Sequence, residues 1–209
     1  MKKIVAFAAL SAVLFSCSNN DDSNAAPDEE PFFSFKVGDV WAYRNYNQNH
    51  GGTFVPTTTD TVKIIGTLIF NGKTYFDFET TSYMSGQVVN SLHTYQRVNE
   101  DGHLVNQNER VLHPGSDTDF TDHYPFTITS ADTLGFMATR LYALQDVDVE
   151  GAAYSAYKYE SYYTPNENGG AEGVGYQTFY SPGVGLVLSR DRYLTDADIR
   201  LETRLIYHK

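Results

Sequence analysis

Hydrophobic and polar residues alternate along most of the chain beyond residue 31, which is the period-two pattern of half-buried β-strands. Val40–Tyr46, Ala153–Thr164 and Ile199–His208 show this alternation. No stretch combines a sustained 3.6-residue period with helix caps, although Met137–Leu144 fits one or two helical turns. The pattern predicts an all-β fold with at most one short helix.

Short motifs that contain glycine divide these strands. Asn71-Gly72 lies between two β-rich runs and predicts a type I′ hairpin turn, because both central residues of that turn need positive φ. Further turns are expected at Ser85-Gly86, Asp101-Gly102, Gly151-Ala152 and Ser181-Pro182-Gly183. Longer loops are expected at Asn47–Thr59 and His113–Tyr124. The spacing predicts a meander of antiparallel strands in a single domain, residues 32–209.

The N-terminus has the layout of an export signal. Two lysines precede an apolar run, Ile4–Phe15, which is shorter than the roughly 20 residues that a membrane-spanning helix needs. Residues 1–16 are therefore predicted to be a signal peptide. The sequence Leu14-Phe15-Ser16-Cys17 resembles a bacterial lipobox, and the resemblance implies cleavage before Cys17 and lipid attachment to it. The alternative is an ordinary secretory signal followed by a free cysteine.

Residues 17–31 are predicted to form a tether. Ser18–Pro31 has no large apolar residue, so it cannot bury enough surface to offset its ordering entropy, and we expect it to be disordered. The run Ser-Asn-Asn-Asp-Asp at 18–22 resembles the export signal of surface lipoproteins in the Bacteroidetes group. This resemblance implies an outer-membrane lipoprotein that faces the cell exterior. The alternative is a plain linker on a lipoprotein that faces the periplasm.

Charge and composition restrict the partners. The chain has 26 Asp and Glu residues against 15 Lys and Arg residues, a formal net charge of −11 at pH 7. Such a chain is repelled by nucleic acid and by anionic headgroups, so no nucleic-acid partner is expected and membrane contact is expected through the lipid anchor. Cys17 is the only cysteine, so packing must hold the fold without a disulfide. The 16 Tyr and 13 Phe suit pleated sheet surfaces.

Three stretches carry a resemblance to a known group of proteins. They are Gly38–Tyr43, Asn71–Tyr75 and Ser181–Val187. In this order they resemble the small, uncharacterised, β-rich lipoproteins that are common in Bacteroidetes, which are similar in outline to the half-barrel of periplasmic lipoprotein carriers. The resemblance implies a curved antiparallel sheet or open half-barrel with an apolar concave face. It implies no catalytic residue and no cofactor.

Aromatic residues are the candidates for ligand binding. Trp41 and Tyr43 share one face of a predicted strand, and Tyr157 and Tyr159 share one face of another. On a concave face they would take an apolar or amphipathic ligand such as a lipid; exposed on the surface they would bind a glycan. Packing in the core competes with both roles and is favoured for Trp41. A structural role in envelope assembly, without a small ligand, is a third possibility.

One acidic loop is a candidate metal site. Asp117, Asp119 and Asp122 are carboxylates at close intervals, which suits the oxygen ligands of Ca²⁺. His113 and His123 in the same loop could add nitrogen ligands for Zn²⁺. The spacing does not match an EF-hand, so a solvated acidic loop is the favoured interpretation.

Catalytic motifs are lacking, so a non-enzymatic protein is expected. Asp77 and Glu79 share a strand face and Glu160 lies on another strand, and a glycosidase needs such a pair across a cleft. The sequence does not show that these carboxylates meet. A Gly-x-Ser-x-Gly elbow is missing, and Cys17 is assigned to the lipid, so familiar nucleophilic catalysis has no nucleophile.

Overall fold

A computed structural model describes residues 31–129, 132–166, 172–193, 196 and 198–209. The predicted signal peptide, Cys17 and all but the last residue of the predicted tether lie outside the described residues. The same holds for two short internal segments and for three single positions near residue 195.

Thirteen β-strands account for the regular structure of the described residues, which contain no helix. The strands are β1 (Val40–Gln48), β2 (Phe54–Phe70), β3 (Lys73–Met84), β4 (Gln87–Val98), β5 (Leu104–Asn106), β6 (Val111–His113), β7 (Thr121–Thr129), β8 (Asp132–Leu141), β9 (Gln145–Val149), β10 (Ala152–Pro165), β11 (Gly173–Ser181), β12 (Gly185–Asp191) and β13 (Leu201–His208). The predicted all-β fold is confirmed.

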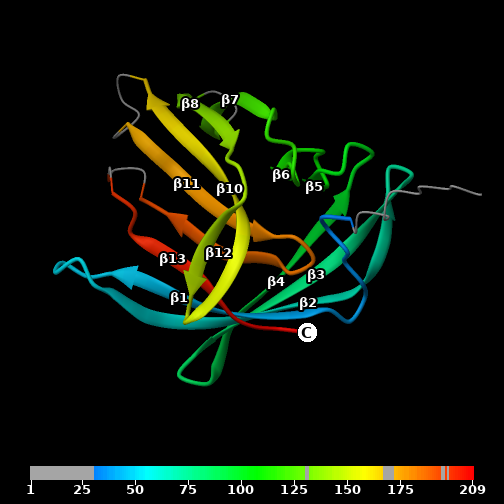
Figure 1. The fold of residues 1–209 in the computed structure, drawn as a ribbon, viewed down its shortest axis with the longest axis horizontal. Coiled ribbons are helices and arrows are strands. Elements are labelled where there is room, and N and C mark those ends of the chain that lie inside the picture. The colour runs from blue at the N-terminus through cyan, green and yellow to red at the C-terminus, as the bar shows by residue number, and fades with distance from the viewer. Residues whose placement is uncertain (1–30, 130–131, 167–171, 194–195, 197) are drawn as a thin grey trace, which may run out of the picture.

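The strands form one antiparallel sheet in the order β6-β5-β4-β3-β2-β1-β13-β12-β11-β10-β8-β7, and β9 pairs with the start of β10 beside this path. The first and last strands of the chain, β1 and β13, pair in the middle of the sheet. β6 and β7 follow each other in sequence but end the sheet at opposite edges. The sheet is therefore curved, with both edges within reach of the short connection between them (Figure 1).

Local turn chemistry explains the hairpins. Asn71 and Gly72 have φ values of 51° and 75°, and Ser85 and Gly86 have 51° and 78°, so both predicted two-residue turns are confirmed. The turn between β9 and β10 uses Glu150 and Gly151 rather than Gly151-Ala152, because the two residues with positive φ (54° and 82°) are one position earlier than expected.

Three predictions about local structure are wrong. The expected helical turns at Met137–Leu144 lie mostly in β8, where pairing with β7 and β10 on both sides outweighs the local helix propensity. The expected loop Asn47–Thr59 ends early, because β2 begins at Phe54 and its threonines pair with β1. The expected loop His113–Tyr124 begins inside β6 and ends inside β7.

The concave face holds an aromatic core. Trp41 and Tyr43 of β1, Phe78 of β3 and Leu205 of β13 are buried there. A segment that precedes β1, residues 31–39, lies against this core and is called the strap. The ring of Phe35 in the strap contacts those of Trp41 and Phe78, at centroid distances of 5.9 and 5.4 Å. The chain thus fills part of its own concave face.

His113 extends this aromatic core. Its ring contacts those of Phe32 and Phe33 in the strap and of Tyr159 and Tyr180 in the sheet. Its Nδ1 accepts a hydrogen bond from the Gly115 N–H, at 3.1 Å. Burial lowers the pKa of His113 to about 3, so the imidazole is neutral and packs as a ring.

The β9–β10 hairpin covers the convex face. Val149 and Ala156 pack against Phe179 and Leu188 in a buried apolar cluster. At the tip, Glu150 accepts a hydrogen bond from the Tyr46 hydroxyl at 2.5 Å and lies 3.3 Å from the guanidinium groups of Arg44 and Arg204. These groups, the Tyr46 hydroxyl first, lower the pKa of Glu150.

Candidate functional site

A cavity of about 280 Å³ lies on the concave face, between β7, β8, β10, β11 and the end of β12. Its apolar walls are formed by Tyr124, Phe126, Met137, Tyr163 and Tyr176. Its charged groups are Arg110, Asp191 and Arg192. This volume lies near the lower end of the range for small-molecule pockets, roughly 300–1,000 Å³, and the mixture of aromatic walls with few polar groups is typical of them.

Strand register explains why these side chains meet. Tyr124 and Phe126 are two residues apart in β7, so they point to the same face, and Tyr124 pairs with Met137 of β8. Gly175 allows β11 to approach closely: a Cβ there would lie 2.6 Å from Ser161 Oγ and 2.8 Å from Met137 Cε. The shape of the cavity therefore depends on a missing side chain in β11.

Two tyrosines of the walls, Tyr163 and Tyr176, are uncharged. Tyr163 is almost fully buried, and its hydroxyl donates a hydrogen bond to the Leu134 carbonyl at 2.9 Å. Burial raises the pKa of Tyr163 and of Tyr176. The rings therefore offer apolar faces at any physiological pH.

Arg110 lies at the mouth of this cavity. It is exposed, its guanidinium donates a hydrogen bond to the Tyr124 hydroxyl, and it stacks over the Tyr124 ring at 4.2 Å from the centroid. No carboxylate of the described residues lies within ion-pairing distance of it, although the chain is strongly acidic. A cation without an ionic partner beside aromatic rings is suited to an anionic ligand group.

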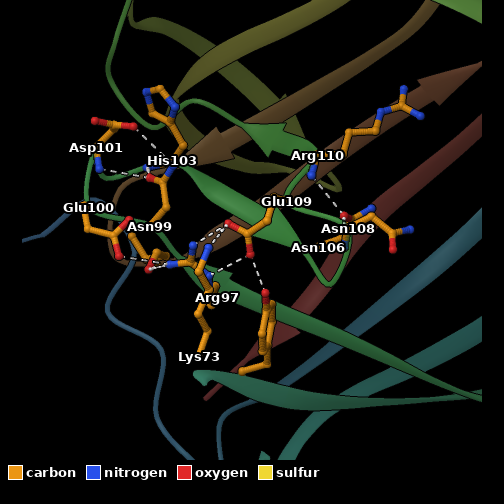
Figure 2. Close-up of polar contacts among 12 residues, drawn as sticks. Lys73, Arg97, Asn99, Glu100, Asp101, His103, Asn106, Asn108, Glu109 and Arg110 are labelled. Carbon is orange, nitrogen blue, oxygen red and sulfur yellow. Dashed lines mark hydrogen bonds and ion pairs between the residues drawn. The ribbon is translucent and has the colours of Figure 1, made fainter. Parts of the chain in front are cut away.

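A tight turn between β5 and β6 fixes the backbone of Arg110. The Asn106 side-chain oxygen accepts hydrogen bonds from the N–H groups of Asn108 and Arg110, at 2.9 and 3.1 Å. Glu109 in this turn has a positive φ of 60°. Figure 2 shows Asn106, Asn108, Glu109 and Arg110 in this turn.

The side chain of Glu109 clamps this turn to the sheet. It accepts hydrogen bonds from Arg97 at 2.5 Å, from Lys73 at 2.8 Å and from the Tyr75 hydroxyl (Figure 2). These bonds, the one from Arg97 first, lower the pKa of Glu109 to about 2. Arg97 and Tyr75 are buried, so the clamp is rigid, and Arg110 is the next residue along the chain.

Asp191 and Arg192 also line the cavity. The Asp191 Oδ1 accepts a hydrogen bond from the Arg192 N–H at 2.8 Å. Arg192 is buried, donates to the Asp196 carbonyl at 2.7 Å and lies 5.6 Å from the centroid of the Tyr163 ring. The lining thus contains two guanidinium groups and one carboxylate.

The structure separates the four aromatic residues that the sequence singled out. Trp41 and Tyr43 are 3% and 6% exposed, and they line a smaller cavity of about 160 Å³ beneath Phe35. The Trp41 Nε1 donates to the Val184 carbonyl at 2.7 Å, and the Tyr43 hydroxyl to the Leu186 carbonyl at 3.1 Å. The idea of Trp41 as an exposed glycan platform is therefore wrong, because the ring is enclosed by the core.

Tyr157 and Tyr159 share the concave face, as predicted, but neither lines the 280 Å³ cavity, and Tyr157 lines a separate pocket of about 500 Å³ beside the strap. Tyr157 is half-buried against Phe32 of the strap. Tyr159 is 1% exposed and packs between His113 and Phe120. Burial raises the pKa of Tyr159 to about 12.

The acidic loop does not assemble a metal site. Asp117 lies 3.3 Å from His103 and accepts a hydrogen bond from the Asp119 N–H, while Asp122 accepts one from the His123 N–H. Within residues 31–209, apart from the positions that the structure leaves undescribed, no three His, Cys, Asp or Glu side chains lie close enough together to hold a metal ion. The proposed ligand set Asp117, Asp119 and Asp122 is therefore not supported, and His113 is enclosed by aromatic rings.

The carboxylates weighed as a catalytic pair serve other interactions. Asp77 lies 2.8 Å and Glu79 4.0 Å from the ring nitrogens of His93. Glu160 binds Gln177 at 2.6 Å, Tyr142 at 2.9 Å and Lys158 at 3.1 Å. None of the three lines the cavity.

Sequence reasoning missed the residues that form the cavity. Tyr124, Tyr163, Tyr176 and Arg110 come from separate strands and a turn, and only the curvature of the sheet brings them together. One local signal was present: Asn106 followed by Arg110 matches an asparagine turn that fixes the orientation of the chain.

Comparisons with known proteins give the fold a limited context. No family model and no curated protein matches the chain. A solved structure from Bacteroides fragilis, described as an exported protein with a YmcC-like fold, has 14% identity and a TM-score of 0.48, and the match covers 86% of this chain and 99% of that one. A structure from Parabacteroides distasonis, described as a lipoprotein, has 15% identity, a TM-score of 0.45 and the same coverage.

Similarities this low do not establish a function or a cellular location for this chain. Lipid attachment at Cys17, the surface location and the likeness to lipoprotein carriers therefore stay predictions. The described part of the chain contains no helix that is long and apolar enough to cross a membrane.

Proposed function

We propose that this chain is a non-enzymatic binding protein, anchored through Cys17 on the outer membrane, that takes a small amphipathic anion in the 280 Å³ cavity. The observation that carries the proposal is Arg110, a guanidinium without an ionic partner among the described residues, held at the mouth of an aromatic cavity. The apolar part of the ligand would lie against Phe126, Met137 and Tyr176. Its anionic group would bind Arg110.

Charge supports an anion over a neutral ligand. The molecule as a whole repels anions at long range, so an anionic ligand needs a local cation, and Arg110 supplies one. The Glu109 clamp and the Asn106 turn position this cation, because they hold the backbone at Arg110 and just before it. A preorganised guanidinium forms a charge-assisted hydrogen bond with little loss of side-chain freedom.

The test is isothermal titration calorimetry of the full chain, kept in solution with detergent, against decanoate and against decanol. Each ligand is kept below the concentration at which it forms micelles. Decanoate is expected to bind, and Arg110→Gln is expected to weaken it by roughly ten- to hundredfold, since a hydrogen bond to a charged group contributes about 1.5–3 kcal/mol. Decanol binding should not respond to Arg110→Gln.

Arg140→Gln is the matched control. Arg140 is an exposed arginine on β8 that pairs in register with Glu160, on the face opposite the cavity. This variant should bind decanoate as the parent chain does. Equal weakening by both substitutions, or equal affinity for decanoate and decanol, would contradict the proposal.

A further inference from the structure

The β3–β4 hairpin projects from the body of the molecule, and most of the outer edge of β4 has no neighbouring strand among the described residues (Figure 1). β4 pairs with β3 from Gln87 to Gln96, but with β5 only from Gln96 to Val98. The outward backbone groups of residues 87–95 therefore have no strand partner in the part of the chain that the structure describes. Such an edge is a template for another strand.

This edge lacks charged side chains. From Thr80 to Gln96 the sequence contains no Asp, Glu, Lys or Arg, in a chain that is 20% charged. Val88 and Leu92 in β4 are 61% and 54% exposed. Soluble proteins commonly protect long edges with lysine, proline, bulges or short strands. A register shift opposite Ser82 and Tyr83 makes a bulge at Val89, which leaves 90–95 as a regular, uncharged edge.

The unpaired N–H and C=O groups of this edge distinguish two kinds of binding partner, lipid and a polypeptide strand. Lipid would cover the apolar side chains, but it cannot satisfy N–H and C=O groups, which are costly to leave unpaired in hydrocarbon. A polypeptide strand satisfies both the backbone and the side chains. A strand therefore fits this edge better than lipid does.

We propose that β4 pairs, antiparallel and through residues 90–95, with β4 of a second copy of this chain. The same edge on both copies gives an isologous contact with two-fold symmetry, which closes after two subunits. Two chains of net charge −11 repel each other, and the uncharged hairpin is where they approach at the lowest electrostatic cost. This contact is separate from the cavity and does not depend on the proposed ligand.

Sedimentation equilibrium of the full chain in density-matched detergent tests this proposal. The parent chain is expected to have twice the mass of one chain, and added salt should strengthen the dimer because it screens the repulsion. Leu92→Lys should give the mass of one chain, because it places a lysine on each of two adjoining edges. Leu144→Lys is the matched control, since Leu144 is 50% exposed in a connection outside the strands, and this variant should remain dimeric.

Hydrogen exchange locates the contact and also checks the fold. Amides of residues 90–95 should exchange more slowly in the parent chain than in Leu92→Lys, while the rest of the domain exchanges equally in both. A monomeric parent, a dimeric Leu92→Lys, an open-ended series of oligomers, or a dimer with unprotected 90–95 amides would each overturn the proposal.

Discussion

At the scale of single residues, Glu109 connects the buried core to the candidate site. Its carboxylate accepts hydrogen bonds from two buried groups, the Arg97 guanidinium and the Tyr75 hydroxyl, and from the Lys73 ammonium group at the surface. The next residue along the chain is Arg110, at the cavity mouth. Arg97 is 5% exposed, and without Glu109 its nearest carboxylate would be that of Glu100, at 3.7 Å, so a buried cation would lose its closest ionic partner. Glu109 is thus a positioning residue for the proposed ligand contact.

Glu109→Gln should lower the free energy of unfolding in a pH-dependent way. The Glu109 carboxyl has a pKa of about 2 in the folded chain against an ordinary value of 4.5. Its stabilisation is therefore complete above pH 4.5 and disappears as the pH falls to about 2. Urea unfolding should show a larger difference between the parent and the variant at pH 7 than at pH 3.

Glu100→Gln is the control for this prediction. Glu100 lies 3.7 Å from the same Arg97 guanidinium, but its side chain is 86% exposed. It should have little effect on unfolding at either pH. A Glu109→Gln difference that stays constant with pH would show that the carboxylate charge is not what stabilises the turn.

At the scale of elements, the strap covers part of the concave face with its own side chains, so no ligand can bind there. Phe33 is 6% exposed and contacts His113 and Tyr180, both at centroid distances of 5.9 Å. The Gly183 N–H donates a hydrogen bond to the Phe32 carbonyl at 3.1 Å, and the Gly38 N–H donates one to the Ile64 carbonyl at 2.8 Å. The strap is therefore a structural part of the domain.

Phe33→Ala should lower the free energy of unfolding by about 3 kcal/mol, because it removes a buried ring and leaves a cavity. Phe70→Ala, the same change at a ring that is 45% exposed, should cost about 1 kcal/mol or less. Denaturant unfolding of both variants checks this. Equal losses would mean that the strap does not pack against the core in solution.

The elements also show what the sequence could predict. The turns at Asn71-Gly72 and Ser85-Gly86 were predictable because positive φ is a property of the turn residues themselves. Alternation placed Trp41 and Tyr43 on one face, and that is correct. β8 was not predictable from Met137–Leu144, because its strand state depends on pairing with β7 and β10, which lie outside this stretch.

The whole molecule explains why the cavity was not predictable. Tyr124 in β7 and Tyr176 in β11 meet only because the sheet curves, and no period along the chain encodes that curvature. The same curvature buries Tyr159 and Trp41, which local alternation cannot distinguish from exposed aromatics. Arg110 reaches Tyr124 because the two edges of the sheet come close together.

The central claim is that the cavity binds an amphipathic anion, and methionine methyl NMR tests it most directly. The chain has three methionines, and of the two in the described residues Met137 lines the cavity while Met84 is 50% exposed on the distant β3–β4 hairpin. In a full chain labelled with ¹³C-methyl methionine, decanoate should shift the Met137 signal in a saturable way and leave Met84 unchanged. An unmoved Met137 signal, or equal shifts at both methyl groups, would contradict the account.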